Sequence, residues 1–185
     1  MSNQTKMYWI PRGRFCLGKE VEAMKKYCDE CGKEVETKVV IKKEAYAVCG
    51  ETIEIDAQVL VCGECGEEFF CEEFDNATLI NAYNEYRRKH KLLLPEEIRK
   101  IREQYGLSQR SFAKLLNWGD KTICRYENGS IQDKAHNSLL LFLREPKNMR
   151  TYLTENEIIL DERKKAKLLD TVDKLEHDTK YRERI

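Results

Sequence analysis

The sequence predicts an α+β fold, in which a small antiparallel β module with one helix precedes an all-α domain and a C-terminal helical tail. Three observations support this fold class. Between Val35 and Val61, apolar residues alternate with polar ones, which is typical of strands with one buried face. Two Cys-x-x-Cys pairs flank this alternating region. From Leu94 onward, apolar residues instead recur at helical spacing, and capping residues mark the ends of several short helices.

The composition of the 185 residues is that of a folded chain with a heavily charged surface, since 41% are hydrophobic and 36% are charged. No apolar run approaches the roughly 18 residues of a membrane span, and residues 1–23 lack the continuous apolar core of a secretory signal. We therefore expect a cytoplasmic protein with no membrane partner. Stable disulfides are uncommon in that reducing compartment, so the eight cysteines favour metal ligation.

Charge is distributed unevenly along the chain, although the formal net charge is zero. Residues 24–90 carry 9 Lys and Arg against 15 Asp and Glu, a formal −6, whereas residues 94–153 carry 11 against 7, a formal +4. An acidic half followed by a basic half suggests two separate tasks. Nucleic acid is the natural partner for the basic half.

The acidic half predicts strands followed by a helix. The turn between two antiparallel strands is expected at Cys49–Glu51. The residues predicted to alternate onto the buried face are Val35, Thr37, Val39 and Ile41, and then Ile53, Ile55, Ala57, Val59 and Val61. Helical spacing follows from Glu72 to Lys91, with one broad face formed by Phe74, Ala77, Ile80, Tyr83 and Tyr86.

Each Cys-x-x-Cys pair is followed by a glycine, and we call these segments the first knuckle (Cys28–Gly32) and the second knuckle (Cys62–Gly66). The glycine lets the chain bend while backbone amides point at sulfur. Two knuckles supply four thiolates, which suits a tetrahedral structural Zn²⁺ with Zn–S distances of about 2.3 Å. A sheet this small has little core, so the metal would contribute much of the folding free energy, on the order of 10 kcal/mol. The predicted ligands are Cys28, Cys31, Cys62 and Cys65.

Four thiols at this spacing also have other uses in proteins. An iron ion of the rubredoxin type would take the same ligands, so the sequence does not separate iron from zinc. A thioredoxin-like redox pair would require a helix start inside a βαβ unit, which neither knuckle has. A catalytic zinc would require a nearby His or Glu partner, and none of the three histidines lies near a knuckle. We therefore expect no enzymatic activity, and we expect Cys16, Cys49, Cys71 and Cys124 to remain outside the metal site.

Sequence signals mark four short helices in the basic half. Pro95 suits the first turn of one helix, and Gly106 follows its last turn. Ser108 is expected to cap the second helix, the third ends at Asn128–Gly129, and the fourth covers residues 135–144. A capping box from Thr154 to Glu157 then predicts a long, mostly solvated helix, with a weak apolar stripe at Ile158, Leu168, Leu169, Val172 and Leu175.

The second and third short helices have the packing pattern of a helix-turn-helix. Two short helices joined by a tight turn at Asn117–Gly119 would bury the apolar residues Leu107, Phe112, Ala113, Leu116, Ile123 and Tyr126 together. Trp118 is expected to pack at the turn. The positions left facing outward are polar: Gln109, Lys121, Thr122 and Arg125.

The segment Leu94–Leu143, with its LSQ, FAKLL and RYENG motifs, resembles an XRE/Cro-type helix-turn-helix domain. With the two knuckles and the thirty residues between them, residues 24 to about 150 resemble the MqsA/YgiT-type antitoxins of bacterial toxin–antitoxin modules. That resemblance implies a zinc module that binds an RNA-cleaving toxin, and a helical domain that dimerises, binds a palindromic operator in double-stranded DNA and represses its own promoter. The tail departs from the short antitoxins and also fits the N-terminal part of a fusion to a SocA/Panacea-type domain.

The resemblance also assigns roles to residues of the helix-turn-helix. It implies that Gln109 hydrogen-bonds a DNA phosphate, and that Lys121 and Arg125 read bases from the recognition helix, beside Thr122. Arginine suits the O6/N7 edge of guanine in a bidentate contact that contributes about 1–3 kcal/mol of discrimination. An ordinary surface ion pair is the alternative for Arg125. Asp120 departs from the pattern, because an acid there repels phosphate unless it accepts from cytosine N4 or serves the helix start.

The fourth helix carries more apolar surface than one small core requires. We expect part of it to form a homodimer interface through Leu140, Leu141 and Phe142. Two copies would place their recognition helices on adjacent major grooves, about 34 Å apart.

The sequence thus divides into four segments: a flexible leader (1–23), a zinc-binding β/α module (24–90), a helix-turn-helix domain (91–153) and a charged C-terminal helix (154–185). The expected function is that of a DNA-binding antitoxin and autorepressor whose zinc module binds the toxin. The alternative is a stand-alone XRE-type regulator, associated with a mobile element or phage, with a structural zinc module and no toxin partner.

Overall fold

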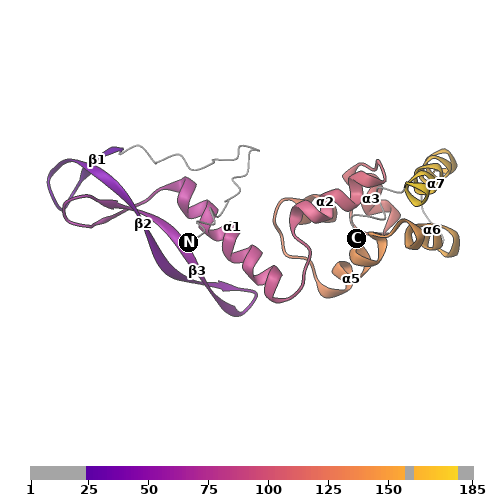
Figure 1. The fold of residues 1–185 in the computed structure, drawn as a ribbon, viewed down its shortest axis with the longest axis horizontal. Coiled ribbons are helices and arrows are strands. Elements are labelled where there is room, and N and C mark those ends of the chain that lie inside the picture. The colour runs from indigo at the N-terminus through magenta and orange to yellow at the C-terminus, as the bar shows by residue number, and fades with distance from the viewer. Residues whose placement is uncertain (1–23, 157–160, 179–185) are drawn as a thin grey trace. The chain divides into compact units, whose positions relative to one another are not determined.

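The structure is a computed structural model that describes residues 24–156 and 161–178. The chain forms two compact units, the first ending at Tyr86 and the second beginning at Arg87, and each is described by itself (Figure 1). The predicted leader, residues 1–23, lies outside the described residues, as does Cys16. Within the described ranges, no helix has both the length and the apolar character that crossing a bilayer requires.

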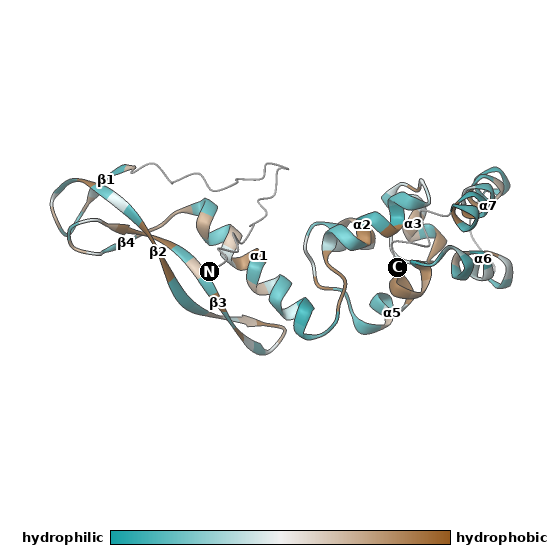
Figure 2. Cartoon of the chain, in the orientation of Figure 1, coloured by the Kyte–Doolittle hydropathy of each residue, from teal (hydrophilic) through white to brown (hydrophobic). Residues whose placement is uncertain are grey.

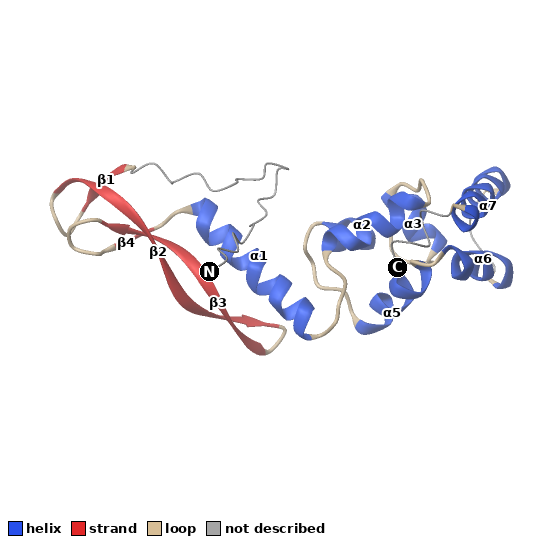
Figure 3. Ribbon diagram, in the orientation of Figure 1, coloured by secondary structure: helices blue, strands red, loops and turns tan. Residues whose placement is uncertain are grey.

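The first unit contains a four-stranded antiparallel sheet in the order β1-β2-β3-β4, which confirms the predicted fold class (Figure 3). The strands are β1 (Lys25–Cys28), β2 (Lys33–Val48), β3 (Glu51–Cys62) and β4 (Glu68–Phe69). Strands β2 and β3 form a long hairpin, paired without interruption from Thr37 opposite Cys62 to Val48 opposite Glu51. Its two turn residues, Cys49 and Gly50, have φ angles of 50° and 84°, as tight hairpin turns require, and the predicted turn is confirmed.

The two halves of this hairpin bury opposite faces. Near the turn, the buried Ile53 lies opposite Tyr46, so the buried face of β2 there carries its even-numbered residues. Near the knuckles, the buried Cys62 lies opposite Thr37, so the buried face of β2 there carries its odd-numbered residues. The predicted single face is therefore wrong in part: Ile41 is 69% exposed, and Leu60 is buried where Val59 and Val61 were expected. The register has no bulge, so the buried face changes without an inserted residue in either strand.

Helix α1 (Glu72–Lys89) accompanies the half near the turn, as Figure 1 shows. Its side chains Thr78 and Ala82 are buried one turn apart. The pKa of Tyr46 on β2 is raised by burial, by its hydrogen bond to Glu44 and by the charge of Asp75 in the first turn of α1, so the two elements are neighbours. The helix carries acids in its first turn and bases in its last, which suits the helix dipole, and the prediction of this helix is confirmed.

In the described part of the second unit, six helices follow the end of α1: α2 (Pro95–Gln104), α3 (Gln109–Leu115), α4 (Thr122–Glu127), α5 (Lys134–Leu143), α6 (Pro146–Glu155) and α7 (Glu162–His177). The predicted end signals are confirmed. The Ser111 backbone N–H donates to the Ser108 hydroxyl at the start of α3, at 3.2 Å. Gly106 and Gly129 end α2 and α4 with φ angles of 63° and 102°.

The core of the second unit draws on all six helices. Figure 2 shows α5 as its most hydrophobic helix, coloured mostly brown. The Tyr105 hydroxyl, buried at the end of α2, donates to the Leu143 carbonyl at 2.6 Å and so ties α2 to α5. The fully buried side chains include Ile98, Phe112, Ile123, Leu140, Leu143, Met149, Leu153 and Val172.

The C-terminal segment differs from its prediction. Thr154 does not start a helix but lies in the last turn of α6, where its hydroxyl donates to the carbonyls of Arg150 and Thr151. Helix α6 begins at Pro146, and α7 is a separate helix capped by Asp161, which accepts from the Arg163 N–H. The predicted capping box at Thr154 is therefore wrong, and Glu157 and Ile158 lie outside the described residues.

Helix α7 is mostly exposed, as predicted, and its apolar stripe packs into the core. Leu168 and Val172 are buried, and Leu169 and Leu175 pack against the same cluster. On the polar side of this contact, Arg150 of α6 forms ion pairs with Asp173 and Glu176 of α7.

We predict that Leu168→Ala will destabilise the second unit by about 2–5 kcal/mol, because it leaves a cavity between α7 and the core. Urea denaturation followed by tryptophan fluorescence would measure the change, in a Trp9→Phe background that leaves Trp118 as the single tryptophan. Lys164→Ala, on the exposed side of the same helix, is the matched control and should change stability by less than about 0.5 kcal/mol. Equal effects of the two substitutions would mean that α7 does not pack as described.

Candidate metal centre and nucleic-acid interface

The two knuckles lie at the same end of the sheet. Cys28 is the last residue of β1 and Cys62 is the last residue of β3, so both flank the start of β2. Cys31 and Cys65 follow in the turns after these strands. The antiparallel order of the sheet therefore brings together cysteines that are more than thirty residues apart in sequence.

The four sulfur atoms form a compact group. The Sγ atoms of Cys28 and Cys65 are 3.5 Å apart, those of Cys31 and Cys62 are 3.8 Å apart, and all four lie within 4.8 Å of one another. A tetrahedral metal with bonds of about 2.3 Å to sulfur has sulfur–sulfur edges of about 3.8 Å. The donor set therefore fits a four-thiolate metal ion, and no carboxylate or imidazole belongs to the group among the residues described.

Backbone geometry orients the second knuckle toward a charged sulfur. The N–H groups of Glu64 and Cys65 both lie 3.4 Å from the Cys62 sulfur and point toward it. Gly66 closes the turn by donating to the Cys62 carbonyl at 3.1 Å, with a φ of 81° that favours glycine. Gly63 is needed for a different reason: a Cβ there would lie 2.6 Å from the Glu36 carbonyl oxygen of β2.

The protonation of the cluster reflects these contacts. The hydrogen bond from the Cys65 backbone lowers the pKa of the Cys62 thiol to about 6, although burial opposes the shift. A hydrogen bond with the Cys65 side chain, together with burial, raises the pKa of Cys31 to about 12. Hydrogen bonding within the group thus favours the thiolate at Cys62 and the thiol at Cys31. A divalent cation would displace the protons and balance the charge.

The other cysteines among the described residues lie outside this group. Cys49 is exposed in the hairpin turn, Cys71 is half-buried just before α1, and Cys124 lies on α4 in the second unit. This arrangement agrees with the distinction that the knuckle spacing predicts between ligands and other cysteines.

The candidate nucleic-acid interface is built on α3 and α4. The turn between them passes through Asn117, which has a φ of 54°, and Trp118 packs there as predicted. The Trp118 ring stacks on His136 with ring centroids 3.8 Å apart, and the Tyr126 hydroxyl lies 2.7 Å from Nδ1 of His136. An aromatic cluster thus fixes the turn before α4 and the end of α4 against α5.

Three of the expected DNA contacts gather at one side of α4. Lys121 is the N-cap residue and is exposed, Thr122 is the first helical residue and is half-buried, and Arg125 is exposed one turn after Lys121. The opposite side of the helix carries Ile123, which is fully buried. Arg125 and Lys121 therefore project together from a helix whose other side is anchored in the core.

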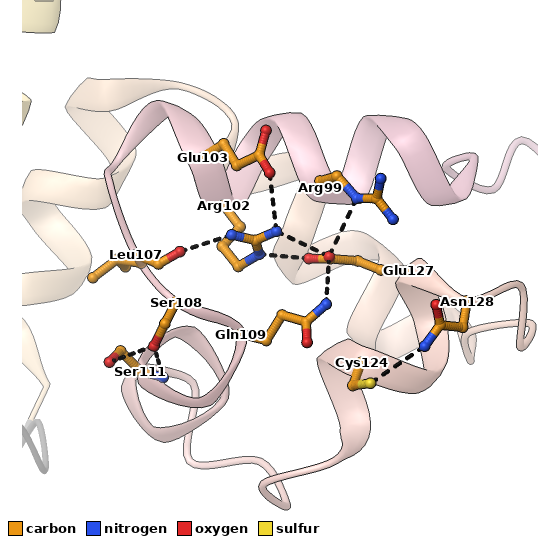
Figure 4. Close-up of polar contacts among 10 residues, drawn as sticks. All are labelled: Arg99, Arg102, Glu103, Leu107, Ser108, Gln109, Ser111, Cys124, Glu127 and Asn128. Atoms are coloured by element: carbon orange, nitrogen blue, oxygen red, sulfur yellow. Dashed lines mark hydrogen bonds and ion pairs between the residues drawn. The ribbon is translucent and has the colours of Figure 1, made fainter. Parts of the chain in front are cut away.

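Gln109 is engaged within the domain. As Figure 4 shows, its Nε2 donates to Oε2 of Glu127 at 2.8 Å. Glu127, the last residue of α4, is buried and also accepts from Arg102 at 2.6 and 2.9 Å, with Arg99 3.5 Å away. Burial alone would raise the pKa of Glu127, but the hydrogen bonds from Arg102 and Gln109 lower it below the ordinary glutamate value.

Sequence reasoning missed the role of Glu127, because none of its partners is adjacent in sequence. Glu127 lies one turn after the buried Ile123, and an acid at that spacing on the apolar side of a helix signals a buried ion pair. Asp120, the acid that departs from the expected pattern, pairs with Arg110 of α3 at 3.1 Å, so its charge is balanced within the domain.

The three residues predicted for a dimer interface differ in exposure. Leu140 is 0% exposed and belongs to the core of its own chain, so it is not accessible to a second copy. Leu141 and Phe142 are 37% and 46% exposed. The helical period explains the difference, because consecutive leucines on a helix do not share a face.

We predict that each chain binds one metal ion and that its removal unfolds the first unit alone. A structural four-thiolate site contributes on the order of 10 kcal/mol to folding, whereas the second unit has its own apolar core. Elemental analysis would give the stoichiometry. Circular dichroism with and without a chelator would follow the strands, while Trp118 fluorescence in a Trp9→Phe background follows the helices.

Cys62→Ser should lower metal content and reproduce the effect of the chelator, whereas Cys49→Ser is the matched control and should retain the metal. A metal-free chain that keeps its β signal after exhaustive chelation would contradict this prediction.

Comparison with known proteins identifies a family for this chain. The family model described as the antitoxin component of a bacterial toxin–antitoxin system, MqsA, matches residues 24–155, which include the four cysteines and helices α1 to α6. No curated protein matches the chain. The family match covers well over half of the sequence, and the chain therefore belongs to the MqsA antitoxin family.

Proposed function

We propose that this protein is the antitoxin and transcriptional autorepressor of a type II toxin–antitoxin module. Membership of the MqsA family supports an antitoxin role, which is regulatory and not enzymatic. The observation that carries the finer proposal is the pairing, in one chain, of a four-cysteine group with a helical unit that presents Lys121 and Arg125 together. The four-cysteine module would support toxin binding, and the helical unit would bind DNA. Both would act in the cytoplasm.

In this proposal the ion is a structural Zn²⁺ held by Cys28, Cys31, Cys62 and Cys65. Zinc favours tetrahedral thiolate sites, and four protein ligands leave no open position for a substrate. The ion would therefore supply rigidity to the sheet and not chemistry. The acidic surface of residues 24–90, with its formal −6, would suit a basic ribonuclease as the toxin.

On DNA, Lys121, Thr122 and Arg125 would contact bases in the major groove, and Gln109 would donate to a phosphate near the start of α3. A single copy has few cationic contacts. A homodimer joined through Leu141 and Phe142 would double them and match a palindromic operator with half-sites about 34 Å apart.

Growth rescue tests the antitoxin proposal. The reading frames adjacent to the chain's gene would be expressed alone and with it, and we expect one of them to arrest growth alone and to be neutralised by the full chain. Cys62→Ser, which weakens the metal group, should lose this protection, whereas Cys49→Ser should keep it. A chain that binds its own promoter but neutralises no neighbour would support the stand-alone regulator instead.

We predict that Arg125→Ala weakens binding to the DNA upstream of the chain's own gene by about 1–3 kcal/mol, because a bidentate contact to a base is lost. Fluorescence anisotropy at fixed salt would measure it. Lys147→Ala, an exposed cation on α6, is the matched control and should change affinity little. Binding by Arg125→Ala equal to that of the unchanged protein would remove Arg125 from the interface.

A further inference from the structure

The polar network of Figure 4 links the two helices that the proposed function assigns to DNA. One carboxylate, that of Glu127, accepts from α2 through Arg102 and from α3 through Gln109, while Glu127 itself ends α4. Its side chain is fully buried and cannot touch DNA. It nevertheless touches Gln109 of α3 and lies two residues after Arg125 of α4. Gln109 and Arg125 are the proposed DNA contacts on these two helices.

We propose that Glu127 is a positioning residue for DNA binding, because it holds the Gln109 amide in the orientation that a phosphate requires; this inference rests on the proposed function. An ionised carboxylate only accepts hydrogen bonds, so it fixes which end of the amide faces inward. The Nε2 atom of Gln109 donates one hydrogen to Glu127 at 2.8 Å, and its second hydrogen remains for an acceptor on the outer side of α3.

The bonds from Arg102 hold the carboxylate itself in place. The guanidinium donates to both Glu127 oxygens, at 2.6 and 2.9 Å, and to the Leu107 carbonyl at 2.8 Å. The pair is screened from water, so its geometry is better fixed than that of a surface pair. Gln109 therefore meets DNA with its amide already oriented, and binding does not have to order a free side chain.

A double-mutant cycle on operator binding tests this role. The probe is a labelled duplex of the DNA immediately upstream of the chain's gene, titrated with the full chain at several salt concentrations. The variants are Gln109→Ala, Glu127→Asp and the two combined. Glu127→Asp keeps a negative charge beside Arg102 but shortens the side chain, which withdraws the carboxylate from Gln109.

We expect each single variant to bind the duplex about tenfold more weakly, and the double variant to bind no more than about twofold more weakly than the weaker single variant. The dependence of affinity on salt should stay unchanged, because Gln109 carries no charge. A merely structural role would move α4, disturb the contacts of Lys121 and Arg125 and reduce the salt dependence.

Glu103→Gln is the matched control, because Glu103 is an exposed partner of the same Arg102, at 3.2 Å, and does not touch Gln109. It should bind within about twofold of the unchanged protein. If Glu127→Asp fails to reach the native circular dichroism spectrum, Arg102→Met combined with Glu127→Leu removes both charges together and should show the same loss as Gln109→Ala.

The outcomes separate this inference from the proposed function. If the two losses of DNA affinity multiply in the double variant, the positioning role alone is overturned. The same holds if Glu127→Asp binds the duplex as tightly as the unchanged protein. Failure of the unchanged protein to prefer the upstream duplex over an unrelated one would overturn the autorepressor proposal, and the positioning role with it.

Discussion

The β module depends on the approach of four sulfur atoms to within 4.8 Å of one another. The cluster that closes the base of the hairpin contains three buried residues, and two of them, Cys28 and Cys62, belong to the sulfur group. The metal ligands are therefore also the core at this end. Little apolar area remains at this end of the sheet if the sulfurs separate, because the buried Val48, Ile53 and Ile55 lie toward the hairpin turn. A cation at this point would replace a hydrophobic core and not merely add to one.

The second unit is stabilised differently. Its core is apolar and continuous, and the buried ion pair between Arg102 and Glu127 lies at its edge. Such pairs contribute little net stability compared with apolar residues of similar size, because two charges lose their hydration. The pair instead fixes the relative orientation of the two side chains, because a guanidinium and a carboxylate meet in few geometries. Packing thus gives this unit its stability, while a polar contact fixes the mutual orientation of its helices.

Much of this organisation could be predicted because local signals were strong. Glycines that follow Cys-x-x-Cys pairs mark the knuckles, and Ser108, Gly106 and Gly129 mark helix ends whatever the tertiary context. Long-range choices were harder to predict. The exposure of Ile41 depends on which element covers each half of the hairpin, and strand periodicity carries no information about that.

The misplaced tail helix has a related cause. Thr154 and Glu157 fit a capping box, but Pro146 had already begun a helix that runs through Thr154. Glu127 was overlooked because the sequence shows neither of its partners, Arg102 and Gln109, beside it. In both cases the residue that decides the local structure is distant in sequence from the residues that carry the signal.

Helix α7 lies beyond the part of the chain that matches the family, yet Leu168 and Val172 complete the same apolar cluster as Met149 and Leu153 of α6. A relative that ended after α6 would leave this side of α6 facing water, and an apolar strip of that kind invites association with another molecule. In the present protein the strip is already occupied from within. Chains that share residues 24–155 can therefore differ in how readily they self-associate, even with identical recognition helices.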